Sequence, residues 1–187
     1  DARDKLLWCL PLVGLEIGLV WWGLGLACRY FGFTQAVTAL VLCGAPYFLT
    51  GFLHLDGFMD VTDAVKSYRD LERRREILKD SHVGSFAVIG CVLLILAQFA
   101  FCVSFNLKTD FRMLIVIPVV SRCCSALAVN GLPKMTTSQY ARKKVRPADI
   151  WIPLLFLAAA LAFGFLLRFR CGLILLVELA GYGLALL

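Results

Sequence analysis

Three aspartates are spaced so that their carboxylates could share one cation. They stand at positions 56, 60 and 63, within the segment 51–63 of sequence GFLHLDGFMDVTD. At about 100° per residue, these positions fall within roughly 60° of one another on an α-helix. Like charges at this spacing repel, and Mg²⁺, which takes oxygen ligands, relieves the repulsion. We therefore expect Asp56, Asp60 and Asp63 to be metal ligands and catalytic residues; the alternative is that they pair with the basic segment 69–79.

A second acidic row follows a few residues later. Glu72, Glu76 and Asp80 are each four residues apart. Asp80 stands where the next apolar segment begins, so we expect it to be both a catalytic residue and a metal ligand. Glu72 is expected to pair with neighbouring arginines on a helix. For Glu76 the sequence leaves two interpretations open, a metal ligand or an ion pair.

Cations are interleaved with these acids. Arginine binds phosphate through two parallel hydrogen bonds, and lysine binds it as a point charge. Carboxylates for Mg²⁺ together with cations for phosphate are what phosphoryl transfer requires. A solvated basic face is the alternative, above all for Arg75. The predicted substrate-binding residues are Arg73, Arg74, Lys79, Ser81 and His82.

The elements that must position these residues are membrane-spanning helices. Of the 187 residues, 60% are apolar and 17% charged, and the mean hydropathy is +0.82. Soluble domains are about 45–50% apolar and about 25% charged, so a water-soluble globule is excluded. We expect an all-α, polytopic bundle in one transmembrane domain, residues 1–187, with an active-site segment at 54–86. Stretches near the roughly 20 residues that a span needs are Leu6–Ala27, Thr34–Leu55, Ser85–Phe105, Phe111–Leu132, Ile150–Leu167 and Cys171–Leu187.

Two polar segments, 56–82 and 134–149, are separated by two predicted spans and therefore lie on one side of the membrane. Both are rich in lysine and arginine, which places them in the cytoplasm by the positive-inside rule. The net charge of +6 then reflects loops beside anionic lipid, and no nucleic-acid partner is expected. The inner membrane is the expected location.

Local patterns suggest how the acidic segment folds. Ser67 and Asp70 fit a capping box for a surface helix over residues 68–79, and Asp80-Ser81 would cap the third span. Glycines at 14, 18, 23 and 25 indicate close helix packing in the first span and could support a homo-oligomer. Because the chain starts at Asp1 and stops within an apolar stretch, we expect a piece trimmed at both ends.

These residues resemble the cobalamin synthase family, adenosylcobinamide-GDP ribazoletransferase. The resemblance rests on His54-Leu55-Asp56-Gly57, Asp60 and Asp63, Arg73-Arg74, the run 76–81 (EILKDS), and Gly84 with Phe86. It is specific over about residues 49–90 and looser elsewhere. Three positions depart from the family's usual pattern: Val61 for Thr, Ala64 for Gly, and His82 where Arg is frequent. The carboxylates are unchanged.

The resemblance implies a polytopic inner-membrane enzyme acting late in vitamin B12 assembly. It implies Mg²⁺-dependent transfer of the adenosylcobinamide phosphate moiety from adenosylcobinamide-GDP to α-ribazole or its 5′-phosphate, with release of GMP. The aspartate motif is the family's proposed active site. If the acceptor is the 5′-hydroxyl, Asp63 could take its proton; a phosphate acceptor needs no base.

Two other classes remain as alternatives. CDP-alcohol phosphotransferases also carry aspartates on helices at a membrane surface, with the motif Asp-x-x-Asp-Gly followed by Gly-x-x-x-Asp-x-x-x-Asp. This chain has Asp-Gly-x-x-Asp-x-x-Asp instead. A small-molecule transporter would need charges deep within several spans, whereas the acids here cluster in one segment.

Overall fold

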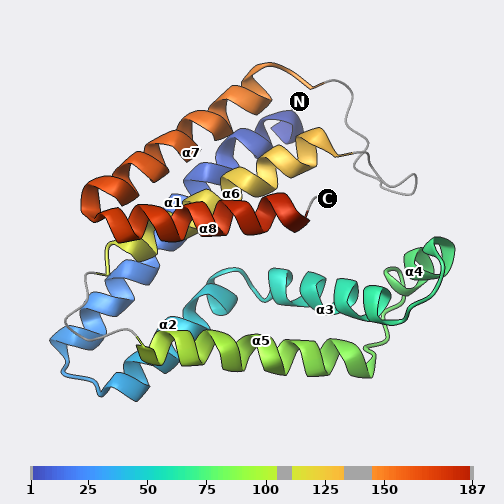
Figure 1. The fold of residues 1–187 in the computed structure, drawn as a ribbon, viewed down its shortest axis with the longest axis horizontal. Helices are drawn as coiled ribbons and strands as arrows, with labels where there is room; N and C mark the ends of the chain where they lie inside the picture. The colour runs from blue at the N-terminus through green and yellow to red at the C-terminus, as the bar shows by residue number, and fades with distance from the viewer. Residues whose placement is uncertain (1, 105–110, 133–144, 186–187) are drawn as a thin grey trace. The chain divides into compact units, whose positions relative to one another are not determined.

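The described chain is helical throughout. The computed structural model describes residues 2–104, 111–132 and 145–185, and within these ranges it contains eight helices and no strand (Figure 1). Most of the second polar segment, residues 133–144, lies outside the described residues, as does the short loop 105–110. The helices are α1 (Ala2–Tyr30), α2 (Gln35–Leu49), α3 (Leu53–Lys66), α4 (Leu71–Ile77), α5 (Ser85–Ser104), α6 (Met113–Gly131), α7 (Ala148–Leu167) and α8 (Phe169–Ala185).

Four of these helices, α1, α5, α6 and α7, are long and apolar enough to cross a membrane. The pair α2 and α3 passes the same test when taken together, which gives up to five spans where the sequence predicted about six. Helix α8 has 17 residues, fewer than the roughly 20 that a spanning helix needs. The prediction of a helical, polytopic membrane protein is confirmed, and the predicted number of spans is approximate.

The predicted second span, Thr34–Leu55, is not one continuous helix. Helix α2 ends at Leu49, α3 begins at Leu53, and their axes differ by 85°. The break contains two consecutive residues of left-handed backbone, Gly51 with φ 58° and Phe52 with φ 62°. Glycine adopts this conformation freely, whereas phenylalanine does so only at a steric cost. The apolar run hid the break because hydropathy does not report backbone dihedral angles.

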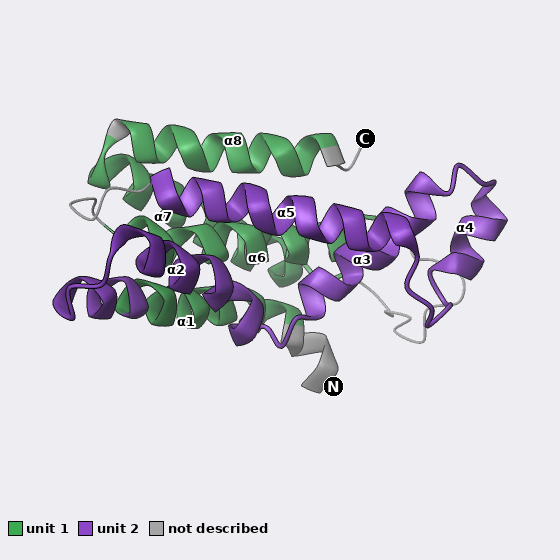
Figure 2. Cartoon of the chain, turned by 90° about the horizontal axis from the view of Figure 1, so that it is seen from below, with its two compact units in different colours: residues 1–23, 110–187 green, residues 24–109 purple. Residues whose placement is uncertain are grey.

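Internal contacts group the chain into two compact units, residues 1–23 with 110–187 and residues 24–109 (Figure 2). We call them unit 1 and unit 2. The single transmembrane domain expected over 1–187 stays a prediction.

Unit 1 is built on close packing of α6 against its neighbours. A Cβ at Gly14 would lie 2.6 Å from the Pro118 carbonyl oxygen, and one at Gly18 would lie 2.8 Å from the Ile115 Cα. The first span therefore lies directly on the backbone of α6, as small residues allow in membranes. The buried core of the unit comes from α6, α7 and α8: Met113, Val116, Val119, Val120, Cys123, Cys124, Leu157, Ala160 and Leu175.

Unit 2 is organised around α5, which packs against both halves of the bent pair. Helix α2 follows the second half of α5, where Gln98 donates a hydrogen bond to the Cys43 carbonyl at 3.2 Å and Tyr47 bonds to the Gln98 side chain. Helix α3 follows the first half, where Thr62 lies against Gly90. The bend at 50–52 therefore falls beside the middle of α5.

The predicted surface helix exists but is shorter, and its cap is different. Helix α4 covers Leu71–Ile77 instead of residues 68–79. Asp70 is its N-cap, accepting a hydrogen bond from the Arg73 amide at 2.8 Å. Ser67 instead ends α3, with its hydroxyl bonded to the Ala64 carbonyl. The capping-box prediction was wrong because Tyr68, at φ 52°, leaves the helical conformation between the two helices.

Candidate active site

Helix α3 carries all three aspartates of the sequence motif, as predicted. It is amphipathic and runs unbroken from Leu53 to Lys66. Asp56 and Asp60 are exposed, and their side chains have no hydrogen bond or ion pair within the described part of the chain. These two carboxylates are therefore available to a ligand.

The position of α3 corrects one expectation. The sequence placed the acids at the end of a spanning helix, but they lie on a separate helix alongside the first half of α5. The physical reason is the left-handed pair Gly51–Phe52, which turns the chain before the acids begin. Figure 1 shows α3 running next to α5, with α2 beside the other half.

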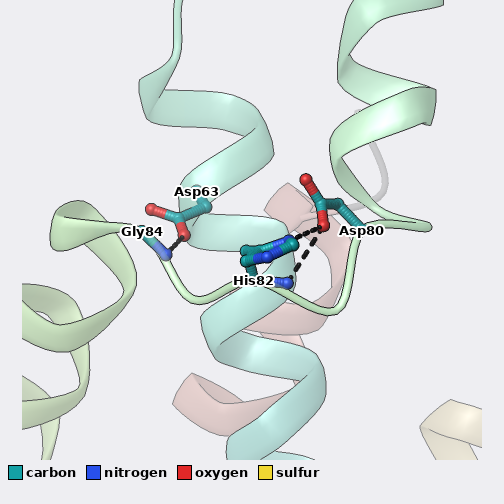
Figure 3. A network of polar contacts seen from close by, with 4 residues as sticks. All are labelled: Asp63, Asp80, His82 and Gly84. Atoms are coloured by element: carbon teal, nitrogen blue, oxygen red, sulfur yellow. Dashed lines mark hydrogen bonds and ion pairs between the residues drawn. The ribbon is translucent and has the colours of Figure 1, made fainter.

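Asp63 differs from the other two acids of α3. Its Oδ2 accepts a hydrogen bond from the Gly84 amide at 2.5 Å (Figure 3). Its Oδ1 accepts one from the Ala87 amide at 2.9 Å. Both donors lie at the start of α5, whose first amides have no partner inside the helix. Asp63 is thus half-buried and engaged with the backbone of a neighbouring helix.

The sequence had suggested that Asp80 caps the third span, but the structure shows otherwise. Helix α5 begins at Ser85, and Asp63 occupies its first amides. Asp80 Oδ1 instead accepts the His82 amide at 3.1 Å and lies 2.5 Å from His82 Nδ1 (Figure 3). The hydrogen bond from the His82 side chain lowers the pKa of the Asp80 carboxyl, and the same bond raises the pKa of the His82 imidazole. Ser81, between them, is exposed.

The cations of α4 divide into paired and available groups. Arg73 forms an ion pair with Glu76 at 2.5 Å. Of the two interpretations of Glu76, a metal ligand or an ion pair, the structure contains the ion pair. Arg74 is half-exposed, and its buried Nε has no hydrogen-bond partner in the described structure. Lys79 is exposed beyond the end of the helix. Among the predicted phosphate-binding cations, Arg74 and Lys79 have no carboxylate partner in the described chain; the exposed Arg75 has none either.

The donor set fits a magnesium ion only in part. Mg²⁺ in proteins is usually held by one or two carboxylates, with waters and substrate phosphates completing its shell. Asp56 and Asp60 meet that description. Within residues 2–104, 111–132 and 145–185, however, no group of three His, Cys, Asp or Glu side chains is arranged to hold a metal. Asp63, Asp80 and Glu76 are engaged elsewhere, so their assignment as ligands stays a prediction.

Sequence reasoning missed a carboxylate in unit 1. Asp149 is fully buried at the start of α7. Its Oδ1 accepts the Trp8 indole N–H at 2.5 Å, and its Oδ2 accepts the Arg146 amide at 2.6 Å. The Asn130 amide donates to the Asp149 carbonyl at 2.8 Å. The available signal was an acid in the first turn of a helix, directly after Pro147 and Ala148.

A groove in unit 1 has a different character from the acidic segment. It has a volume of about 250 Å³ and exposes no polar surface. The residues that line it carry no side chain that binds phosphate or a cation. The lining comes from α1, α6 and α7: Leu15, Ile115, Val116, Val119, Phe156, Ala159, Ala160 and Phe163.

The fold and this segment define a polytopic helical membrane protein with free carboxylates and cations on neighbouring short helices. The whole chain, residues 1–187, matches the cobalamin-5-phosphate synthase family. The chain belongs to that family.

Curated relatives agree with the family assignment. Adenosylcobinamide-GDP ribazoletransferase of Clostridium perfringens strain 13 is 45% identical over 132 residues, which cover 70% of this chain and 50% of the relative. The protein of that name from strain SM101 is 41% identical over 143 residues, covering 75% and 57%. That from Clostridium botulinum strain Alaska E43 is 33% identical over 182 residues, covering 95% and 72%. The chain spans about half the length of the first two. Comparison with solved structures gives no match.

Proposed function

We propose that this chain acts as an adenosylcobinamide-GDP ribazoletransferase. It would transfer the adenosylcobinamide phosphate moiety from adenosylcobinamide-GDP to α-ribazole or its 5′-phosphate, with GMP leaving. The observation that carries the proposal is the pair of exposed, unpartnered carboxylates on α3, Asp56 and Asp60, in a member of this family. The names of the curated relatives support the substrates.

The reaction is a substitution at phosphorus. An oxygen of the acceptor forms a new bond to the phosphorus of the cobinamide phosphate, and the bond from that phosphorus to the GMP oxygen breaks. The attacking oxygen is a hydroxyl of the ribazole sugar in either acceptor, and its proton passes to an α3 carboxylate. When the acceptor carries a 5′-phosphate, that phosphate is retained in the product.

The charges of the segment suit this substitution. Asp56 and Asp60 would hold Mg²⁺, which when bound neutralises charge developing on the diphosphate. Arg74 and Lys79 would bind phosphate oxygens of the donor or acceptor, since neither is engaged by a carboxylate. Arg73 would also bind phosphate once its ion pair with Glu76 is broken. Both side chains of that pair are exposed, so breaking it costs little free energy.

We also propose that the enzyme lies in the inner membrane with this segment facing the cytoplasm. The lysines and arginines of residues 66–79 and 134–146 favour that orientation. A corrinoid with a nucleotide attached is large and water-soluble at one end, so access from the aqueous side suits it.

The test is turnover by the purified protein with adenosylcobinamide-GDP, α-ribazole and Mg²⁺. The expected result is formation of the cobalamin product with an equal amount of GMP, and loss of turnover when a chelator removes the metal. Parallel assays with CDP-activated lipid address the alternative enzyme class through CMP release. Release of CMP, or of no nucleotide, would overturn the proposal.

A further inference from the structure

We infer that Asp63 is a positioning residue: its carboxylate caps α5 and thereby holds α3 in register along that helix, while Asp56 and Asp60 bind the cation. The division among the three acids rests on the proposed function. The capping role does not, because it follows from contacts within unit 2 alone.

The start of α5 needs an acceptor that its own sequence does not supply. The first four amides of an α-helix have no partner within the helix, and the residue before Ser85 is Gly84, which has no side chain. Asp63 provides acceptors for two of these amides, one oxygen for the Gly84 amide and the other for the Ala87 amide. Its negative charge also lies at the end of α5 where the helix dipole is positive.

Glycine at position 84 is explained by this carboxylate. A Cβ there would lie 2.6 Å from both Cγ and Oδ1 of Asp63, and these are atoms of a side chain held by two hydrogen bonds. Gly84 is not among the residues with positive φ, so the space matters here and not the conformational freedom. Gly84 and Asp63 therefore fit each other as a pair.

A second close contact fixes the register of the two helices. A Cβ at Gly90 would lie 2.9 Å from the Thr62 methyl carbon and 3.6 Å from the Phe58 ring. Adjacent residues of α3 thus fit against two glycines, Gly84 directly before α5 and Gly90 within it. Ala87, between these glycines, is 1% exposed. A shift of α3 along α5 would break the hydrogen bonds and the close packing together.

The same contacts determine where the free carboxylates lie. Asp60 is about one turn from Asp63 on a continuous helix, and Asp56 about one turn further. Both are exposed and unpartnered, unlike Asp63. Holding the Asp63 end of α3 against α5 therefore also sets the positions of Asp60 and Asp56.

The test compares Asp63→Asn, Asp63→Ala and Asp60→Asn in the full chain, purified in detergent. The first measurement is hydrogen exchange of the α5 amides 84–88. Asp63→Ala should speed exchange about tenfold, the size of losing a helix cap. Asp63→Asn should have a smaller effect, because asparagine also caps helices, and Asp60→Asn should have none. Gly84→Ala should reproduce the Asp63→Ala result from the other side of the contact.

The second measurement is binding of Mn²⁺, used as a spectroscopic substitute for Mg²⁺. Asp60→Asn should weaken Mn²⁺ binding at least about tenfold, whereas Asp63→Asn should leave the affinity within about threefold, because a ligand carboxylate contributes charge that an amide cannot. If Asp63→Ala does not fold, Asp63→Asn and Gly84→Ala still decide the result.

Unchanged exchange in both Asp63→Ala and Gly84→Ala would overturn the capping role. Equal loss of Mn²⁺ binding in Asp63→Asn and Asp60→Asn would show that Asp63 is a ligand and overturn the division. Mn²⁺ binding that no α3 substitution affects would overturn the metal site of the proposed function, and the exchange result would still decide the capping role by itself.

Discussion

Two carboxylates, Asp149 at the start of α7 in unit 1 and Asp60 in the middle of α3 in unit 2, have opposite surroundings. Asp149 is 0% exposed, and each of its oxygens accepts a hydrogen bond. Asp60 is exposed, with no side-chain partner in the described chain. Burying a carboxylate is costly unless hydrogen bonds replace the lost water, so the partners of Asp149 indicate a structural role.

Asp63 stands between these two cases, since it is half-buried and accepts two backbone hydrogen bonds. The number of hydrogen-bond donors around an acid therefore distinguishes structural acids from those that remain available to a ligand. Residue type and spacing do not make that separation.

The largest expected effect is on turnover. Asp60→Asn should lower turnover at least about 100-fold, because the loss of metal-based charge stabilisation amounts to several kcal/mol. The thermal unfolding temperature should stay unchanged, because no partner of Asp60 is lost. Steady-state GMP release and a thermal unfolding curve in the same detergent measure the two quantities. Near-normal turnover would show that Asp60 is not part of the active site, and its difference from Asp149 would then have no functional meaning.

The next effect is on stability. Asp149→Ala should lower the free energy of unfolding by about 2–4 kcal/mol, because the Trp8 and Arg146 donors lose their acceptor in a buried place. Trp8→Phe removes one of these bonds and should cost about 1 kcal/mol. Unfolding in detergent measures both changes, with Asp60→Asn as the matched control. A stability loss in Asp60→Asn as large as in Asp149→Ala would contradict the distinction between a structural Asp149 and an Asp60 without protein partners.

The smallest effect is a pH dependence at the exposed pair Asp80–His82. The raised pKa of His82 means that its contribution to stability is complete below its unfolded value of about 6.5 and is lost as pH rises through the folded value. The lowered pKa of Asp80 means that its contribution is present above its unfolded value of about 3.9 and is lost as pH falls through the folded value. The contribution of the pair to stability is therefore complete between about pH 3.9 and about pH 6.5.

An NMR titration of the His82 ring measures this pair directly. Asp80→Asn should return the His82 pKa toward its ordinary value of about 6.5, with the His54 signal as internal reference. Adding Mg²⁺ should leave the His82 titration in place if Asp80 keeps its present partner. A fall of the His82 pKa on adding Mg²⁺ would instead make Asp80 a metal ligand and place it with Asp60 among the acids that bind a ligand.

Much of the helical architecture could be predicted from the sequence. The predicted spans at 85–105, 111–132 and 150–167 correspond to α5, α6 and α7 within a few residues. Long apolar runs allow few structures in lipid, because every backbone polar group must be satisfied within the segment. The predicted span 34–55 failed at Gly51–Phe52, where two left-handed residues interrupt an apolar run. Apolarity of the run does not determine such a break.

The site was predictable in composition but not in its contacts. The sequence identified Asp56, Asp60 and Asp63 as residues of one helical face, and α3 contains all three. It gave no sign that Asp63 would bond to the amides of residues 84 and 87. It also assigned the cap of α5 to Asp80, which is nearer in sequence but bonds to His82 instead.

By itself the sequence determined the local features: the helices, their apolar character, and the crowding of acids and cations into one segment. Helical periodicity and hydropathy are properties of neighbouring residues, so they can be read along the chain. The tertiary structure decided which acids are satisfied and which are free. Gly84, which donates to Asp63, and Trp8, which donates to Asp149, lie 21 and 141 residues away from these acids. Only the packing of helices brings such donors within hydrogen-bonding distance.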